Sequence, residues 1–206
     1  MVNLSVPLIN SGKQNLSLIN PVLVASGTFS NGLEMSKHKN IEGLGGIISK
    51  GTTIKPREGN DTPRLIETPS GLINSIGFQN IGATKFIEDI VPIWQKWNVA
   101  TIVNIMGYTV QEYGILAEKF DDINSIDALE INISCPNVEA GGIEFGQDPQ
   151  LAKEVMKVVK KRTEKPCIVK LSPIVSNIQE IISVLQDNGA DAVTISNTYP
   201  AMAIDI

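Results

Sequence analysis

The sequence has few of the residues from which metal centres, disulfides and nucleic-acid surfaces are built. Its 206 residues include one histidine and two cysteines, Cys135 and Cys167, which lie far apart in the chain. Two isolated cysteines form neither a disulfide framework nor a zinc or iron–sulfur ligand set, so we expect no metal in this chain. Acidic residues outnumber basic ones by 22 to 17, and the net charge of −5 offers no basic face to nucleic acid or to an anionic membrane.

Long hydrophobic runs are also missing. No apolar segment reaches the roughly 20 residues that a membrane-spanning helix needs, and the first residues lack the basic and apolar stretches of a secretory signal. The phosphate-binding patterns GxGxxG and GxxxxGK[ST] are absent as well. With 42% hydrophobic and 19% charged residues, the composition is that of a globular protein, and residues 1–206 suit a single domain. We therefore expect a cytoplasmic protein that binds neither membrane nor nucleic acid.

What is present is an alternation of short apolar runs and helix-like stretches. Each run is rich in Ile and Val and apolar on both faces, as in a parallel sheet covered by helices. Capping boxes begin at Thr109 and Ser176, Asp148 precedes a proline, and Gly189 follows the last helical stretch. The pattern predicts an α/β fold, for which we favour a TIM (β/α)8 barrel over an open doubly wound sheet. The runs span residues 22–27, 45–51, 101–107, 128–134, 167–172 and 192–197.

Three features depart from a simple barrel. A complete barrel has eight strands and usually takes about 250 residues, so six visible runs predict an incomplete barrel or a sheet completed in another way. Residues 2–19 contain two strand-like pieces around Ser11-Gly12 and predict a hairpin at the bottom of the barrel. Residues 54–82 form a long excursion rich in glycine and proline, and a loop of this length in a compact domain is usually functional.

Polar side chains are expected to converge at the carboxyl rim of the barrel. Glu130, Asn132 and Ser134 alternate with apolar residues, which should face the outer helices and leave the polar residues inside. Asn104 occupies an equivalent inward position. Any one of these residues could be an ordinary solvent-exposed rim residue, but together they favour a pocket for a planar, polar, anionic ligand. The remaining polar residues at strand ends are Lys50, Lys170, Asn197 and Thr198.

The segment 134–146 leaves the fourth run at this rim and carries three glycines, which suit a mobile lid. Cys135 lies at its base, and that position makes it a candidate reactive thiol. An isolated cysteine is by default an inert buried residue, and we interpret Cys167 in that way. His38 lies in a charged helical stretch and is interpreted as a surface residue.

Residues 132–138 (NISCPNV) and 141–146 (GGIEFG) resemble the active-site loop of class 1 dihydroorotate dehydrogenases. The cysteine and the GGxxFG ending are similar to the B subclass, whose catalytic subunit binds FMN. Further matches follow the order of the family across nearly the whole chain. They are residues 25–28 (ASGT), 50–51 (KG), 63–64 (PR), 67–69 (ETP), 74–80 (NSIGFQN), 170–173 (KLSP) and 197–198 (NT).

The resemblance implies oxidation of (S)-dihydroorotate to orotate in pyrimidine (UMP) biosynthesis. By position, Cys135 would be the catalytic base that removes the C5 proton while the C6 hydride passes to FMN. The resemblance also assigns two groups of contacts. Substrate contacts would be Lys50, Asn74, Ser75, Ile76, Gly77, Phe78, Asn132, Asn197 and Thr198. FMN contacts would be Ser26, Lys50, Gly51, Asn104, Asn132, Lys170 and Ser196.

The resemblance further implies a homodimer that joins a second subunit carrying FAD and a [2Fe-2S] cluster, forming a heterotetramer that passes electrons to NAD⁺. The family's barrel continues through strands seven and eight, whose loops hold the FMN phosphate, so this chain is expected to lack the phosphate site. Three alternatives remain open. They are a dihydropyrimidine dehydrogenase-like flavoenzyme, a Schiff-base aldolase that uses Lys170, and an inactive fragment.

Overall fold

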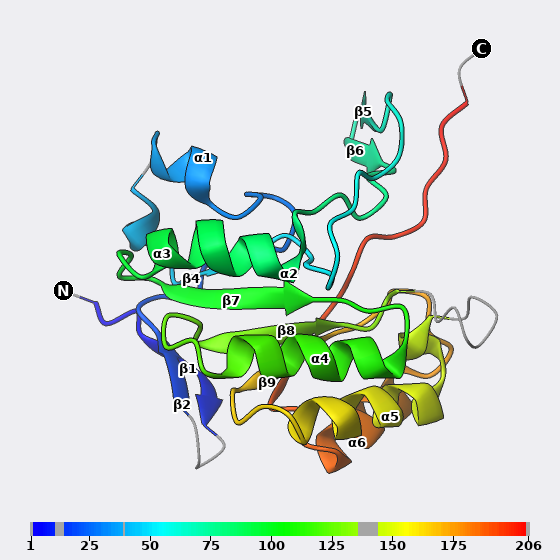
Figure 1. Ribbon diagram of the computed structural model, residues 1–206. Coiled ribbons are helices and arrows are strands. Elements are labelled where there is room, and N and C mark those ends of the chain that lie inside the picture. Colours follow the sequence, from blue (N-terminus) through cyan, green and yellow to red (C-terminus); the bar gives the residue numbers. More distant parts are fainter. Residues whose placement is uncertain (1, 11–14, 39, 136–143, 205–206) are drawn as a thin grey trace.

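The computed structural model describes residues 2–10, 15–38, 40–135 and 144–204. Its centre is a curled sheet of six parallel strands with helices packed against its outer face (Figure 1). The strand order β10-β9-β8-β7-β4-β3 follows the chain, so the sheet is a partial TIM barrel. The strands are β3 (Leu23–Val24), β4 (Gly46–Ile48), β7 (Ala100–Ile105), β8 (Ala128–Asn132), β9 (Cys167–Lys170) and β10 (Ala192–Thr194).

Helical segments connect each strand to the next, as right-handed parallel crossovers require. A fully buried aromatic cluster fixes the segment between β4 and β7, where the Phe86 ring meets Trp94 and Phe120 edge to face. The main core thus lies between the helices and the outer face of the sheet. The helices are α1 (Leu33–Ser36), η1 (Ile41–Gly43), α2 (Gly82–Lys85), η2 (Phe86–Ile90), α3 (Val91–Trp94), α4 (Val110–Asp121), η3 (Phe145–Gln147), α5 (Pro149–Lys160) and α6 (Ile178–Asp187). Within the described residues, none is long and apolar enough to cross a membrane.

All six predicted strands are confirmed, although each is shorter than its apolar run. The difference is largest at residues 22–27 and 45–51, of which only Leu23–Val24 and Gly46–Ile48 are strand. After Val24 the chain turns, with the Thr28 amide donating to the Ala25 carbonyl at 3.2 Å and Gly27 at a φ of 89°. β3 is an edge strand that pairs only with β4, so no second neighbour in the described sheet offers hydrogen bonds that would lengthen it.

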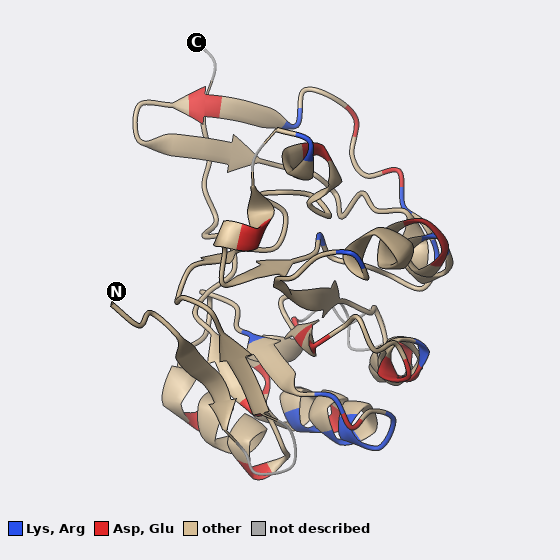
Figure 2. Cartoon of the chain, turned by 90° about the vertical axis from the view of Figure 1, so that its left-hand side faces the viewer, with Lys and Arg blue, Asp and Glu red and all other residues tan. Residues whose placement is uncertain are grey.

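Two of the three predicted helix starts are confirmed. The Thr109 hydroxyl accepts from the Glu112 amide, and the Asp148 carboxylate accepts from the amides of Gln150 and Leu151. The prediction of a cap at Ser176 is wrong by one residue, because the side chain of Asn177 accepts from the Glu180 amide instead. Lysines gather in the last turn of α5, where a helix favours positive charge (Figure 2).

The amino-terminal residues form an antiparallel hairpin of β1 (Val6–Asn10) and β2 (Asn15–Leu18). Its apolar side chains pack against the inner face of the sheet, at the amino ends of the strands. Since this cluster is separate from the main core, the hairpin closes the half-barrel from below. The cluster consists of Ile9, Leu16, Leu18, Ile48, Ile102, Ala128 and Ile168.

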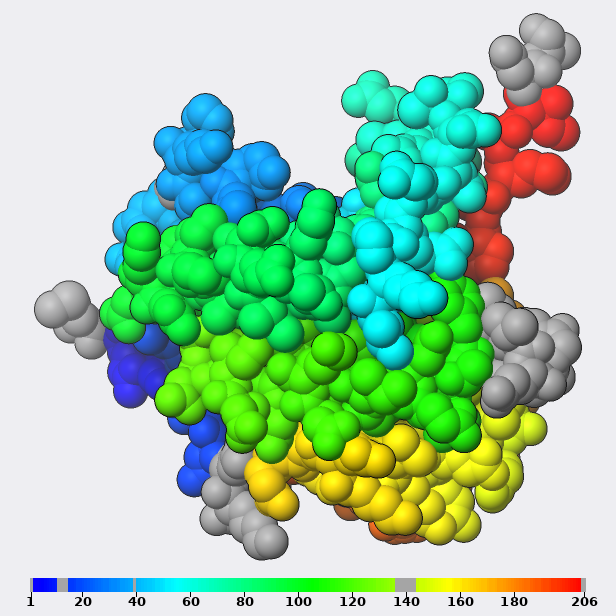
Figure 3. Space-filling view, viewed as in Figure 1, coloured from blue at the N-terminus to red at the C-terminus, as the bar shows by residue number. Residues whose placement is uncertain are grey.

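The excursion after β4 carries a second hairpin, formed by β5 (Leu65–Thr68) and β6 (Gly71–Asn74). It projects from the body beside the carboxyl-terminal segment (Figure 3). Leu65 and Leu72 are exposed on it, so the hairpin is not part of the core. An isolated bridge between Arg57 and Asn80 holds the two ends of the excursion together.

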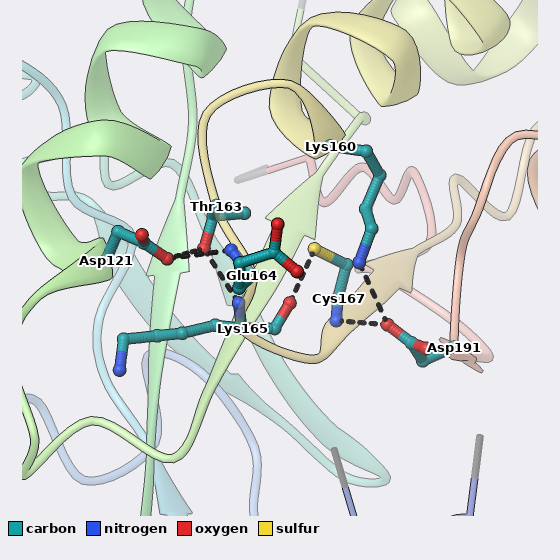
Figure 4. Close-up of polar contacts among 7 residues, drawn as sticks. All are labelled: Asp121, Lys160, Thr163, Glu164, Lys165, Cys167 and Asp191. Atoms are coloured by element: carbon teal, nitrogen blue, oxygen red, sulfur yellow. Dashed lines mark hydrogen bonds and ion pairs between the residues drawn. The ribbon is translucent and has the colours of Figure 1, made fainter. Parts of the chain in front are cut away.

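A polar network at the amino ends of the strands fixes the loops there (Figure 4). The Asp121 carboxylate accepts from the Thr163 hydroxyl at 2.5 Å and from the Glu164 amide at 2.9 Å. The Asp191 carboxylate accepts from the Cys167 amide at 2.8 Å and lies 3.6 Å from the Lys160 ammonium. The Cys167 thiol is fully buried here, and burial raises its pKa to about 12. This environment agrees with an inert, structural cysteine.

Candidate active site

The inner face of the sheet is polar at the carboxyl ends of the strands. Leu129, Ile131 and Ile133 belong to the outer core, so the alternation of β8 sends Glu130 and Asn132 inward, as the sequence predicts. Neighbouring strands are in register here: Glu130 lies opposite Asn104, and Asn132 lies opposite Lys170.

Two layers of hydrogen bonds cross this inner face. In the lower layer the Glu130 carboxylate accepts from Asn104 Nδ2 at 2.5 Å and from Thr194 Oγ1 at 2.8 Å. In the upper layer Asn197 Nδ2 donates to Asn132 Oδ1 at 3.1 Å. The bonds join side chains of β7, β8 and β10 and of the segment after β10. The inner face is therefore ordered without help from a ligand.

A cavity of about 340 Å³ opens above these layers. It brings together four of the predicted substrate-binding residues from two distant segments. Its wall contains two buried polar atoms, Ser134 Oγ and Glu144 Oε2, that have no hydrogen-bond partner in the described part of the chain. Buried polar atoms of this kind suit a polar ligand. The four predicted residues in the wall are Asn74, Phe78, Asn197 and Thr198.

Lys50 does not line this cavity. It lines a second cavity, also of about 340 Å³, together with Arg57, Gln79 and Asn80. Burial and the charge of Arg64 lower the pKa of the Lys50 ammonium. The two cavities have no lining residue in common, so the structure does not bring Lys50 into the cavity that contains Asn197.

The predicted residues Ser75, Ile76 and Gly77 line neither cavity, and Asn60 holds them in place. Asn60 Nδ2 donates to the Ser75 carbonyl at 3.0 Å, and the Asn60 amide donates to the Ile76 carbonyl at 3.1 Å. At Gly77, where φ is 69°, a Cβ atom would lie 2.5 Å from the Asn60 amide nitrogen. Sequence reasoning missed Asn60, whose position inside the glycine-rich excursion was the only available signal.

Cys135 follows β8 and is 1% exposed. Burial raises the pKa of its thiol to about 12, and the nearby Tyr113 hydroxyl opposes this effect only in part. Tyr113 is itself fully buried and donates to the Asn132 carbonyl at 2.6 Å. The Arg57 guanidinium stacks 4.9 Å from the centre of the Tyr108 ring, close to the same site. In this arrangement Cys135 is a thiol rather than a thiolate at neutral pH.

The predicted lid, residues 134–146, is described only in part. Residues 136–143 lie outside the described residues. On the two sides of this gap, the Phe145 amide donates to the Cys135 carbonyl at 3.3 Å and the Gly146 amide donates to the Ile133 carbonyl at 2.8 Å. The two ends of the predicted lid are therefore tied to each other beside the cysteine.

Comparison with known proteins identifies the family. The family model for dihydroorotate dehydrogenase matches residues 9–206. The chain belongs to the dihydroorotate dehydrogenase family. It is 53% identical to the dihydroorotate dehydrogenase B (NAD(+)) catalytic subunit of Desulforamulus reducens and 49% identical to that of Geotalea uraniireducens, each over 191 residues. That of Geobacter sulfurreducens is also 49% identical over 191 residues. These alignments cover 93% of this chain and 63% of each relative, so the chain spans less than two thirds of the length of its relatives.

The residues that resemble the family's FMN contacts fit a flavin in part. Asn104 is fully buried, and its Oδ1 has no hydrogen-bond partner in the described chain. At Gly51 a Cβ atom would lie 3.1 Å from that oxygen and 3.1 Å from Met106 Sδ, so any larger residue would crowd Asn104. Lys170 is 7% exposed and forms no ion pair with any described residue. Ser26 and Ser196 are half-buried at the ends of β3 and β10.

Proposed function

We propose that the chain catalyses the oxidation of (S)-dihydroorotate to orotate, with FMN as hydride acceptor, in pyrimidine biosynthesis in the cytoplasm. The observation that carries the proposal is the cavity that gathers Asn74, Asn197 and Thr198 around two buried polar atoms that have no hydrogen-bond partner among the described residues. The Asn74 amide and the second N–H of the Asn197 amide are donors suited to a carboxylate or a planar ring, while the Thr198 hydroxyl donates to Asn197 Oδ1 at 3.2 Å. Family membership supplies the reaction.

Asn104, Lys170 and Gly51 would hold the flavin ring, with Ser26, Asn132 and Ser196 at its margin. When bound, FMN supplies the acceptor for the C6 hydride. The buried Lys170 ammonium would stabilise negative charge that develops on the ring. The inner hydrogen-bond layers hold Asn132 and Asn104 in fixed positions, so neither side chain has to reorganise when a ligand binds.

Cys135 would remove the C5 proton of the substrate. A thiolate is the form that accepts a proton, and burial keeps this thiol protonated in the present arrangement. Substrate binding must therefore change the surroundings of Cys135, and Tyr113 and Arg57 are the nearby groups that favour the thiolate. The rate at which dihydroorotate reduces the flavin should rise with pH, because the thiolate fraction of Cys135 grows as the pH approaches the pKa of its thiol.

The first experiment is an anaerobic titration of the purified chain, supplied with FMN, by dihydroorotate. Loss of the flavin absorbance band on addition would demonstrate flavin binding and the reductive half-reaction together. If the band persists although FMN is bound, the chain does not catalyse this reaction, which is the outcome for an inactive fragment. Dihydrouracil is the matched control, since it lacks the carboxylate; faster bleaching with dihydrouracil would favour a dihydropyrimidine dehydrogenase-like activity.

Replacement of the cysteine tests its role. We expect Cys135→Ser to slow flavin reduction near neutral pH by at least about 100-fold, because general base catalysis contributes roughly 10²–10⁴-fold. Cys167→Ser, the other buried cysteine, is the control and should leave the rate within a few-fold of the original. An unchanged rate in the Cys135 variant would remove it from the mechanism.

We further propose that electrons leave the flavin for NAD⁺ through a partner subunit that carries FAD and a [2Fe-2S] cluster, with two copies of this chain at the centre of a heterotetramer. The relatives are named NAD(+)-linked catalytic subunits, which supports a separate electron-transfer subunit. In the described residues no group of three or more His, Cys, Asp or Glu could hold a metal ion, so in this proposal the partner would carry the cluster. Co-expression with such a subunit followed by sedimentation would give the stoichiometry.

A further inference from the structure

Glu130 is a buried carboxylate to which no role has been assigned. It is 0% exposed and forms no ion pair with any described residue. Its only described hydrogen bonds come from Asn104 Nδ2 at 2.5 Å and Thr194 Oγ1 at 2.8 Å, one to each carboxylate oxygen. Both carboxyl oxygens are therefore engaged by directed hydrogen bonds, as buried polar groups require.

The carboxylate determines which way the Asn104 amide faces. Both oxygens of the Glu130 carboxyl group accept hydrogen bonds, and the one from Asn104 Nδ2 turns the NH₂ group of Asn104 toward Glu130. Asn104 Oδ1 then points elsewhere, and it is buried without a partner in the described chain. A Cβ atom on Gly51 would lie 3.1 Å from this oxygen. The free acceptor therefore faces the rim between β4 and β7.

We propose that Glu130 is a positioning residue, which fixes the Asn104 carboxamide so that Oδ1 accepts a hydrogen bond from a ring N–H of the bound flavin. The inference rests on the proposed function, which supplies the flavin. Glu130 does not touch the ligand; it acts through Asn104. Thr194 orients the other carboxylate oxygen and so ties β10 to the same arrangement.

Two variants test the direction of the hydrogen bond: Glu130→Gln alone, and Glu130→Gln combined with Asn104→Asp, which exchanges the amide and the carboxyl group. In Glu130→Gln the new amide can donate to Asn104 Oδ1, which lets Asn104 turn its own NH₂ toward the ring N–H. Two donors would then face each other, and we expect the Kd for FMN, measured by flavin fluorescence, to rise roughly tenfold or more. Adding Asn104→Asp should restore the Kd to within a few-fold, because the glutamine donates to one aspartate oxygen and leaves the other as the free acceptor.

Thr163→Val is the matched control. It removes a buried hydroxyl that donates to a carboxylate at the opposite end of the sheet, with the same length of 2.5 Å as the Asn104–Glu130 bond. Its Kd for FMN should equal that of the unchanged chain, even if thermal unfolding shows a similar loss of stability. Wild-type affinity in Glu130→Gln would overturn the proposal. So would a weakened affinity that the added Asn104→Asp does not restore, because Glu130 would then act only through stability.

A measurement on the unchanged chain covers the case in which the variants do not fold. Nuclear magnetic resonance should find the Asn104 side-chain NH₂ protons protected from exchange both before and after FMN is added. Loss of protection on addition would mean that the amide turns its NH₂ to the ligand, against the proposal. If the unchanged chain binds no FMN, the proposed function fails together with this inference; if FMN binds and Glu130→Gln alone leaves the Kd unchanged, only the inference fails.

Discussion

Both cysteine thiols are buried, and burial raises the pKa of each to about 12 although they lie at opposite ends of the strands. The sequence distinguishes them by position, because Cys135 begins a loop at the carboxyl rim whereas Cys167 begins a strand. It does not predict that Cys135 is as protonated as Cys167, since burial depends on how Tyr113 and the residues near Phe145 pack around it.

The two thiols give the folded chain a defined dependence on alkaline pH. In the unfolded chain a cysteine has a pKa of about 8.5, so the raised folded values stabilise the protein fully below that pH and less as the pH rises toward 12. Urea unfolding under reducing conditions should show stability falling between about pH 8.5 and 10, by up to roughly 1.4 kcal/mol per pH unit for each thiol. Cys167→Ala should show a shallower fall. Equal slopes in the two proteins would exclude a contribution from Cys167.

The alternation within β8 was enough to predict which residues point inward, because a strand has a fixed period of two. It placed Glu130 and Asn132 correctly, and the same alternation in β7 placed Asn104. It could not predict that Lys50 lines a separate cavity, nor that Asn60 holds the segment around Gly77. Those positions depend on the path of a long excursion, which local sequence does not determine.

At the scale of elements, the start of α6 follows capping chemistry, but two overlapping caps compete for it. Residues 176–179 and 177–180 both match the capping pattern, one residue apart, and the sequence alone favoured the first. The structure uses the second, in which Asn177 is the cap and Ile181 and Leu185 face the core. The helix therefore begins at Ile178, one residue later than a cap at Ser176 would start it.

This competition can be measured. Asn177→Ala should destabilise the chain by about 1 kcal/mol, because it leaves the Glu180 amide without its acceptor. Ser176→Ala is the matched change one residue away and should alter stability by less than about 0.5 kcal/mol, since Ser176 is exposed outside the helix. Urea unfolding of both variants gives the comparison. A larger loss for Ser176→Ala would return the cap to the position first predicted.

For the whole molecule, the alternation of strands and helices predicted the order of the sheet, since successive parallel strands lie side by side. It could not show how the inner face is closed, which depends on contacts between residues distant in the chain. In the structure, Leu16 and Leu18 from the first hairpin fill the lower end of the half-barrel beside Ile102. The sheet has two open edges, β3 and β10, within the described strands, so this inner cluster has few other sources of packing.

The hairpin should therefore contribute to the stability of the whole sheet rather than fold as an appendage. Leu18 is 2% exposed in the inner cluster, and Leu18→Ala should lower the free energy of unfolding by roughly 2–5 kcal/mol, as for other buried leucines. Leu4 precedes the same hairpin and is 58% exposed, so Leu4→Ala is the matched control and should change stability by less than about 0.5 kcal/mol. Circular dichroism in the far and near ultraviolet should follow one shared transition in both variants. If Leu18→Ala instead unfolded the hairpin separately and left the main transition in place, the half-barrel would be stable without its lower closure, and the inner hydrogen-bond layers would have to account for its curvature.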